Sequence, residues 1–310
     1  MKRFLTYITS FVAFLYILAL GMDYGISMKL QRSPDRRYQG WSKIINEQLN
    51  ADLVVMGSSR AWVQYDPAIL DSILSLNTYN LGIDGSGLNR QIAKYDVYNH
   101  YQEKNPNYII LNIDFFAAEE WSYGYEREQF FPFMWDTYVR EEILRIEPMS
   151  WGERFIPLYR YVTYKGLYNV LRENPWDANT YKGYMGHERT WNPSALNDLT
   201  TYHFNVDERV NELFDCFLKE RKNEGVNVIF CYAPIYVGFF EKVSNADDFF
   251  AYYKSKADQY DIPILDYTFS ELSMDTTYFY NASHLNKQGA ELFSTQLAKD
   301  LVKLQWINHK

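Results

Sequence analysis

Residues 52–59 have the sequence DLVVMGSS, and this stretch decides the fold class. Four consecutive apolar residues follow Asp52, and Gly57 and two serines end the run. A short, continuous apolar run bounded by turn residues is typical of a strand that is buried on both faces of a parallel sheet. The sequence therefore predicts a strand over residues 52–56 that ends in a small, hydroxyl-bearing turn.

Similar apolar runs recur along the chain and alternate with segments of helical periodicity. Further strands are predicted at residues 78–81, 108–113, 226–232 and 263–266. Helices are predicted at residues 36–50, 67–76, 87–104, 207–223, 247–260 and 286–304. Strands that alternate with helices form a parallel sheet with helices on both faces, so we expect a three-layer α/β/α fold.

This alternation is interrupted between about residues 117 and 206, where aromatic residues are frequent. In the whole chain, 18% of the residues are Phe, Trp or Tyr. We interpret residues 117–206 as an aromatic-rich helical insertion within a single domain of residues 31–310. Its rings suit two roles, a lid that stacks on sugar rings or a layer of packed side chains, and the sequence leaves both open.

The first 30 residues form a separate N-terminal segment. Lys2 and Arg3 precede an apolar stretch over residues 4–22, close to the about 20 residues that a helix needs to cross the hydrocarbon core. The positive flank is expected to stay in the cytoplasm, which places the rest of the chain in the periplasm or at the cell surface. The length of the stretch favours an uncleaved, single-pass membrane anchor. A cleaved signal peptide is the alternative, because residues 19–21 (ALG) suit a cleavage site.

Charge and cysteine content exclude several functional classes. The formal net charge is −8, and no run of Lys and Arg could follow a phosphate backbone, so we expect no nucleic-acid partner. The two cysteines provide neither a disulfide framework nor the spacing of metal ligands. We therefore expect no metal and no organic cofactor.

Three polar loops lie where an open parallel sheet binds its ligands, at carboxyl ends of strands or beside the last helix. They are GSSR at residues 57–60, NLGIDGSG at residues 80–87 and NASHLNKQGA at residues 281–290. Each loop alone is a common turn, but a hydroxyl-bearing turn after the first strand, a glycine loop after the second and a His beside the last helix form a more specific combination. A serine such as Ser59 reacts only when a base removes its proton, and the imidazole of His284 suits that task near neutral pH.

In these loops the chain resembles the SGNH/GDSL hydrolase superfamily, over about residues 50–115 and 224–305. It looks closest to the membrane-anchored members with Gly-Ser-Ser in place of Gly-Asp-Ser, which include the D-alanylation accessory protein of teichoic acid synthesis and polysaccharide O-acetylation factors. The resemblance implies a flavodoxin-like sheet, with Ser59 as the nucleophile and His284 as the general base. It also implies that the backbone N–H groups of Ser59 and Gly85 stabilise the oxyanion.

Two positions depart from the pattern of this family. The Asn that usually donates to the oxyanion after the third strand is missing, because its place falls near Phe116 and Asn112 comes about four residues too early. Asn281 stands where the family has the Asp that orients the imidazole. An amide oxygen can accept the Nδ1–H bond, but it cannot stabilise the imidazolium by charge.

The missing acid leaves three explanations open. The chain has a Ser-His dyad, or it takes an acid from elsewhere, with Asp275 and Asp266 as candidates, or it has lost hydrolysis. Arg60 beside the nucleophile also has two interpretations. It holds an anionic group of the substrate, or it pairs with Asp114 as part of the structure.

We therefore expect an extracytoplasmic serine esterase or O-acyltransferase that forms an acyl-enzyme on Ser59. The resemblance and the location imply that its substrates are acyl esters, above all acetyl esters, of cell-envelope or exported glycans. An acylated small molecule is the other candidate substrate. A membrane-bound O-acyltransferase is the implied partner. The alternative is a non-catalytic glycan-binding or scaffold protein that uses the same cleft.

Overall fold

The computed structural model describes residues 1–310 except 120–126, 164–179, 193–200 and 308–310. Contacts within the chain group residues 1–47 with 123–178 in one compact unit, and residues 48–122 with 179–310 in a second. We call these the helical unit and the sheet unit. The predicted insertion contributes to both units, and the assignment of residues 31–310 to one domain stays a prediction.

The sheet unit contains five parallel strands in the order β2-β1-β3-β4-β5. They are β1 (Leu53–Met56), β2 (Thr78–Asn80), β3 (Tyr108–Asn112), β4 (Asn227–Tyr232) and β5 (Ile264–Asp266). Each predicted strand is present. The order is that of flavodoxin-like sheets, so the predicted α/β fold class is confirmed.

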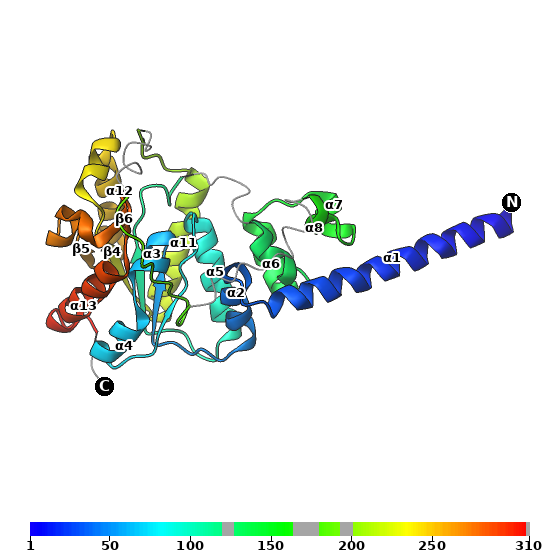
Figure 1. The fold of residues 1–310 in the computed structure, drawn as a ribbon, viewed down its shortest axis with the longest axis horizontal. Coiled ribbons are helices and arrows are strands. Elements are labelled where there is room, and N and C mark those ends of the chain that lie inside the picture. Colours follow the sequence, from blue (N-terminus) through cyan, green and yellow to red (C-terminus); the bar gives the residue numbers. More distant parts are fainter. Residues whose placement is uncertain (120–126, 164–179, 193–200, 308–310) are drawn as a thin grey trace. The chain divides into compact units, whose positions relative to one another are not determined.

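Helices cover both faces of this sheet (Figure 1). They are α3 (Ser59–Gln64), α4 (Pro67–Leu74), α5 (Leu88–Tyr101), α11 (Glu208–Glu224), α12 (Ala246–Tyr260) and α13 (Lys287–Lys303), and the 3-10 helices are η3 (Val237–Lys242), η4 (Glu271–Met274) and η5 (Thr276–Tyr278). Helix α13 packs on α3 and α4, and α11 packs on α5 and α12.

Successive side chains of a strand point to opposite faces of the sheet, and β4 shows this directly. Cys231 joins the core that α13 covers. Phe230, one residue earlier, packs its ring on Phe214 of α11 and on Tyr253 of α12. The strand is therefore buried on both faces, which explains why its sequence is continuously apolar.

A two-stranded antiparallel hairpin precedes α13. Its strands are β6 (Phe279–Asn281) and β7 (His284–Leu285), and they set Asn281 opposite His284. Strands of three and two residues are too short to show any periodicity, so the sequence pattern gives no sign of this hairpin. It nevertheless fixes the position of the predicted base.

The helical unit begins with α1 (Lys2–Gln31). In the described residues it also contains α2 (Arg36–Asn46), η1 (Arg127–Phe133), α6 (Thr137–Ile146), α7 (Trp151–Phe155) and α8 (Tyr159–Thr163). Over its most apolar stretch α1 has a mean hydropathy of 2.0, and in the described part of the chain it is the one helix long and apolar enough to cross a membrane. These two properties suit a membrane anchor and a signal sequence alike.

Candidate active site

Ser59 lies where β1 turns into α3. Gly57 has a φ of +148°, and a Cβ at this position would come within 2.7 Å of the Ala61 Cβ and 2.8 Å of the Asn112 Cβ, so the turn requires glycine. Ser59 is the first residue of α3, and its backbone N–H donates to no other described residue. Such N–H groups have no partner within their own helix. The turn thus presents a hydroxyl and an N–H at the carboxyl end of β1.

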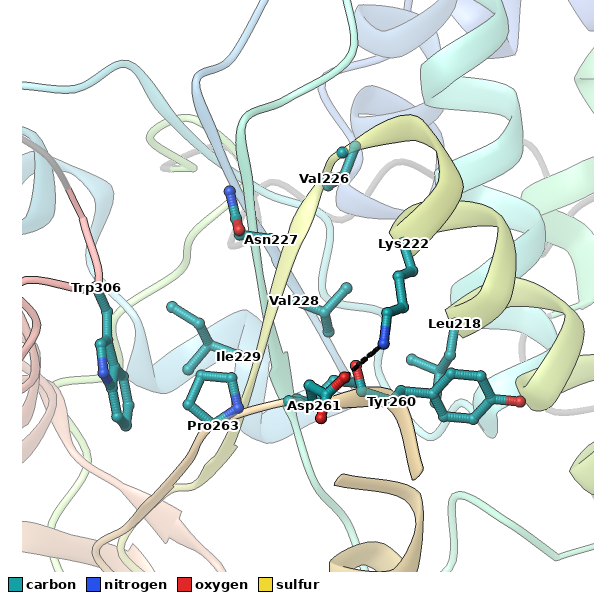
Figure 2. Close-up of a pocket in the computed structure, with 12 residues that line it drawn as sticks. Leu218, Lys222, Val226, Asn227, Val228, Ile229, Tyr260, Asp261, Pro263 and Trp306 are labelled. Carbon is teal, nitrogen blue, oxygen red and sulfur yellow. Dashed lines mark hydrogen bonds and ion pairs between the residues drawn. The ribbon is translucent and has the colours of Figure 1, made fainter. Parts of the chain in front are cut away.

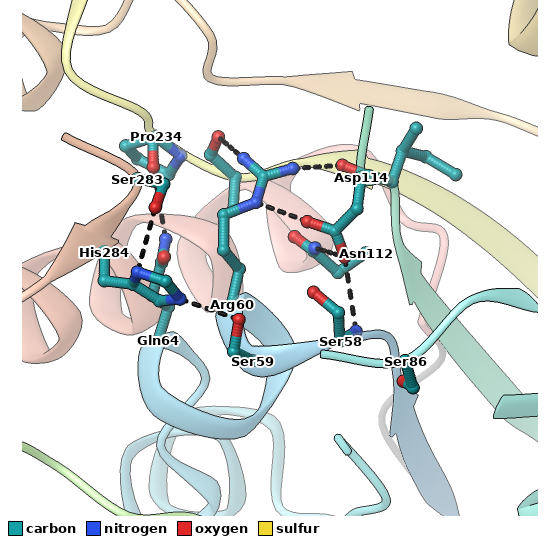
Figure 3. A network of polar contacts seen from close by, with 12 residues as sticks. Ser58, Ser59, Arg60, Gln64, Ser86, Asn112, Asp114, Pro234, Ser283 and His284 are labelled. Atoms are coloured by element: carbon teal, nitrogen blue, oxygen red, sulfur yellow. Dashed lines mark hydrogen bonds and ion pairs between the residues drawn. The ribbon is translucent and has the colours of Figure 1, made fainter. Parts of the chain in front are cut away.

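Asp114, just beyond β3, supports this turn (Figure 3). Its carboxylate accepts hydrogen bonds from Arg60 Nε at 2.5 Å, from Asn112 Nδ2 at 3.0 Å and from the backbone N–H of Ser58 at 3.2 Å. Arg60 is 5% exposed and also donates to two backbone oxygens. The predicted substrate contact of Arg60 is corrected here, because the guanidinium is buried and the alternative, a pair with Asp114, is what the structure shows.

His284 faces Ser59 from β7. Its Nε2 lies 2.7 Å from Ser59 Oγ, although 225 residues separate the two in sequence. Its Nδ1 lies 2.9 Å from Asn281 Oδ1 and 2.9 Å from Ser283 Oγ. The structure therefore brings Ser59, His284 and Asn281 together in the relative positions that the sequence assigns to them.

The surroundings of Asn281 determine which imidazole nitrogen carries the proton. The backbone N–H of Ser283 donates to Asn281 at 3.1 Å, and a backbone N–H can only donate, so the atom that receives it is the amide oxygen. The same oxygen contacts His284 Nδ1, and a proton on Nδ1 satisfies this contact while the Ser283 hydroxyl, also 2.9 Å from Nδ1, donates to Asn281 Oδ1. Nε2 consequently turns its lone pair toward Ser59 Oγ. An amide in this position selects the same tautomer as a carboxylate would.

Burial and charge keep this imidazole neutral. Desolvation by the surrounding protein, helped by the Arg60 guanidinium, lowers the pKa of His284 from 6.5 to about 4; the Asp114 carboxylate acts in the opposite direction and His187 adds a further small lowering. Tyr280 stacks on the imidazole with a ring separation of 5.4 Å and an interplanar angle of 13°. The base is therefore unprotonated at neutral pH, as proton abstraction from a serine requires.

The loop after β2 lies beside the nucleophile turn. The N–H of Ile83 donates to the oxygen of Gly57 at 3.1 Å, and a Cβ on Gly82 would come within 2.4 Å of the Trp62 backbone nitrogen. Gly85 is exposed, has a φ of +61°, and its N–H donates to no other described residue. Its N–H and that of Ser59 are thus both available to a developing oxyanion, and the oxyanion role of Gly85 stays a prediction.

Both polar atoms of the Asn112 side chain have a partner in the structure. Its Nδ2 donates to Asp114, and its Oδ1 accepts from the hydroxyl of Tyr65 at 2.8 Å. Phe116, at the place of the family's Asn, is 38% exposed. Asn112 is thus held away from an oxyanion role by two buried partners, and it supports the nucleophile turn through Asp114 instead.

The two alternative acids, Asp275 and Asp266, bind partners other than His284. Asp275 accepts from the backbone N–H and the hydroxyl of Thr277. Asp266 ends β5 and accepts from the N–H of Thr268 at 2.9 Å. Neither forms a hydrogen bond with His284 within the described residues, whereas Asn281 and Ser283 both contact its Nδ1. The orienting role of Asn281 stays a prediction.

A segment of the predicted insertion, residues 180–192, runs along the rim of this site. The N–H of Met185 donates to the oxygen of Trp62 at 3.1 Å, and the N–H of Lys287 donates to the oxygen of His187 at 2.8 Å. The His187 ring packs edge-on against the rings of Trp62 and Tyr280. The sequence did not single out His187, because its only signal was its place in an aromatic-rich stretch.

A cavity of about 310 Å³ lies at the opposite end of the strands, where β4 and β5 begin (Figure 2). Its walls include the first residues of β4, Pro263 and Trp306, and an ion pair between Lys222 and Asp261 closes part of its rim at 2.6 Å. It holds none of the residues that converge on Ser59. We assign the site by the convergence of Ser59 and His284 rather than by the size of this cavity.

No protein-family model matches the sequence, and no curated protein matches it either. Solved structures do: a protein of Desulfitobacterium hafniense DCB-2 assigned to the G-D-S-L lipolytic family is 13% identical, with 80% of this chain and 97% of that chain covered at a TM-score of 0.41. A Bacteroides fragilis protein described as an acylhydrolase is 14% identical, with 83% and 89% covered at a TM-score of 0.36.

An acetyl xylan esterase from the rumen bacterium Butyrivibrio proteoclasticus is 12% identical, with 82% of this chain and 64% of that chain covered at a TM-score of 0.35. All three proteins are thus named for lipolytic, acylhydrolase or esterase activity. Identities and TM-scores this low do not place the chain in a family. Its function has to be inferred from the geometry of its own site.

Proposed function

We propose that this protein is a serine esterase or O-acyltransferase that works through an acyl-enzyme on Ser59. The observation that carries this proposal is the 2.7 Å contact between Ser59 Oγ and His284 Nε2. A nucleophile and a base within hydrogen-bond distance, with the base held by a third group, is the arrangement that nucleophilic catalysis needs.

The reaction follows from these positions. Ser59 Oγ attacks the carbonyl carbon of an ester while its proton passes to His284 Nε2. The negative charge on the carbonyl oxygen is held by the N–H groups of Ser59 and Gly85. The intermediate then expels the alcohol, which takes the proton from Nε2, and the acyl group stays on Ser59. Water or a glycan hydroxyl then attacks the acyl carbon and gives its proton to Nε2. The bond to Ser59 Oγ breaks, and Oγ takes this proton back, so that free Ser59 and a neutral His284 are restored.

The location and the substrate class are part of the same proposal. The hydropathy and length of α1 support a single-pass anchor with the sheet unit outside the cytoplasm. An extracytoplasmic site suits acyl esters, above all acetyl esters, of envelope or exported glycans. A membrane-bound O-acyltransferase is the partner that would supply the acyl group if a glycan hydroxyl, rather than water, is the acceptor.

The test is covalent labelling of the full-length protein in detergent with a fluorophosphonate, which phosphonylates activated serines. We expect wild-type protein to be labelled and Ser59→Ala and His284→Ala not to be. Ser58→Ala is the matched control, because the Ser58 hydroxyl has no partner within the described residues and should not influence Ser59. Well-folded wild-type protein that takes up no label would contradict the proposal and favour a glycan-binding or scaffold role.

A further inference from the structure

Helix α1 changes its surroundings part of the way along its length. Its apolar side chains between Phe4 and Leu18 are exposed, whereas Asp23, Ser27 and Leu30 are buried within the helical unit. If the exposed part lies in a membrane, the boundary of the bilayer falls between these two parts, at about residues 18–23.

A segment distant in sequence is fastened to α1 at that level. Asp23, 1% exposed, accepts from the backbone N–H of Leu158 at 2.8 Å and forms an ion pair with Arg160. Nearer the N-terminus, the hydroxyl of Tyr16 donates to the oxygen of Phe155 at 3.0 Å. Helices α7 and α8 are therefore held beside α1 at the level where the side chains of α1 change from exposed to buried.

These two short helices expose a group of apolar side chains that we call the apolar ridge. It consists of Trp151, Phe155, Ile156 and Val162, which are 69%, 52%, 40% and 57% exposed. The rings of Trp151 and Phe155 lie 5.9 Å apart. Four apolar side chains exposed to this degree on two helices that contact each other suit an interaction surface.

The charge beside the ridge indicates what covers it. Arg154 lies over the Phe155 ring at 5.3 Å, and no acidic side chain in the described residues forms an ion pair with it. Arg154 and Arg140 also line a cavity of about 340 Å³ that Tyr16 and Leu20 of α1 border. An aromatic side chain beside a cation, at the end of an apolar helix, suits the headgroup region of a bilayer, where rings sit at the headgroup level and arginine reaches phosphate.

We propose that the apolar ridge inserts into the lipid headgroup region next to α1, so that the helical unit rests on the membrane at two points. This inference depends on the proposal that α1 crosses a membrane. The ridge continues the apolar surface of α1, and Arg154 matches the negative charge of phospholipids. Interfacial helices of this kind bury their apolar side chains about 5–10 Å into the boundary between headgroups and acyl chains.

The test uses an environment-sensitive NBD label on single cysteines in the full-length chain. Cys216→Ser removes the exposed native cysteine, and Cys231 is buried. The label is placed by Phe155→Cys or, as a second position on the ridge, Val162→Cys. Ile8→Cys reports on α1, and Lys299→Cys, exposed on α13, is the aqueous control. The protein is reconstituted into vesicles of phosphatidylethanolamine and phosphatidylglycerol that carry nitroxide at the headgroup or deep in the acyl chain.

We expect the labels at 155 and 162 to shift their emission to the blue and to be quenched more strongly by headgroup nitroxide than by deep nitroxide. The label at position 8 should show the opposite order, and that at 299 neither. Quenching at 8 without quenching at 155 and 162 would overturn the ridge proposal and leave the anchor intact. No quenching at 8 would overturn the anchor itself. Shielding of 155 in native membranes but not in vesicles would mean that a protein partner covers the ridge, again contrary to the proposal.

Discussion

Each of the two units of this molecule contains a buried aspartate that pairs with an arginine. In the sheet unit Asp114 binds Arg60, Asn112 Nδ2 and the N–H of Ser58. In the helical unit Asp23 binds Arg160, Trp135 Nε1 and the N–H of Leu158. Each carboxylate is 1% exposed and collects three sets of donors.

The two pairs differ in what they hold. The donors to Asp114 come from the turn and helix that follow β1 and from the end of the neighbouring strand β3, and one of them precedes the nucleophile. The donors to Asp23 come from residues 135–160, more than 100 positions later in the sequence. Their hydrogen bonds tie this segment to the apolar helix α1. The same chemistry therefore holds the turn that carries Ser59 in one unit and fastens the apolar helix α1 in the other. A buried ion pair alone does not reveal which of these it does.

The largest effect is expected from Asp114→Ala. The substitution leaves the buried Arg60 without its anion, which costs about 3–5 kcal/mol of folding free energy when one partner of a buried pair is removed. It also releases the N–H of Ser58, so fluorophosphonate labelling of Ser59 should be lost. Urea unfolding and labelling kinetics measure the two effects.

Asp114→Asn keeps the shape and an acceptor, so it should recover part of the stability. Asp275→Ala, at an exposed carboxylate that caps η5, is the control; it should cost no more stability than the loss of one cap and leave the labelling of Ser59 unchanged. Wild-type labelling kinetics in folded Asp114→Asn would show that the carboxylate stabilises the fold without positioning Ser59.

Asp23→Ala should have a comparable but local effect. It leaves Arg160 and Trp135 without an acceptor and should destabilise the helical unit by about 3 kcal/mol. Hydrogen exchange over residues 127–163 should accelerate, whereas the rate of Ser59 labelling should not change. A loss of labelling as large as that in Asp114→Ala would contradict the division of roles between the two aspartates.

The sequence predicted the sheet and its order of elements because buried parallel strands leave continuous apolar runs such as residues 53–56. It also singled out Ser59, His284 and Asn281 as candidates, because each lies in a short polar loop next to a predicted element and at a position of the pattern of the family that the chain resembles. Their catalytic roles stay predictions. It could not separate the two interpretations of Arg60, since pairing with Asp114 depends on the distance between two strand ends. Nor could it foresee the contact of Asp23 with Leu158 and Arg160, which links residues over 130 positions apart without any periodic signal.

The pH dependence of labelling tests how the Arg60–Asp114 pair and burial affect the pKa of His284. Desolvation and the Arg60 cation lower the pKa of His284 to about 4, so the base stays unprotonated well below its usual range. The labelling rate should be flat down to about pH 5 and then fall, approaching tenfold per pH unit below the pKa as the base becomes protonated. Tryptophan emission at each pH controls for unfolding. A midpoint near 6.5 would mean that the imidazole is more solvated than the structure shows.

The smallest effect is expected from Asn281→Asp. The amide oxygen already selects the reactive tautomer, so the new carboxylate adds only charge stabilisation of the imidazolium. The gain in labelling rate should therefore be about tenfold, well short of the ~10⁴ that separates Asp from Asn where the amide gives the wrong tautomer. A negative charge 2.9 Å from Nδ1 must also raise the pKa of His284, so the midpoint of the pH profile should move upward. Ser283→Ala, which removes the other contact of Nδ1, should leave that midpoint almost unchanged. If Asn281→Asp alters neither the rate nor the midpoint, residue 281 does not orient the base, and Ser59 and His284 act as a dyad.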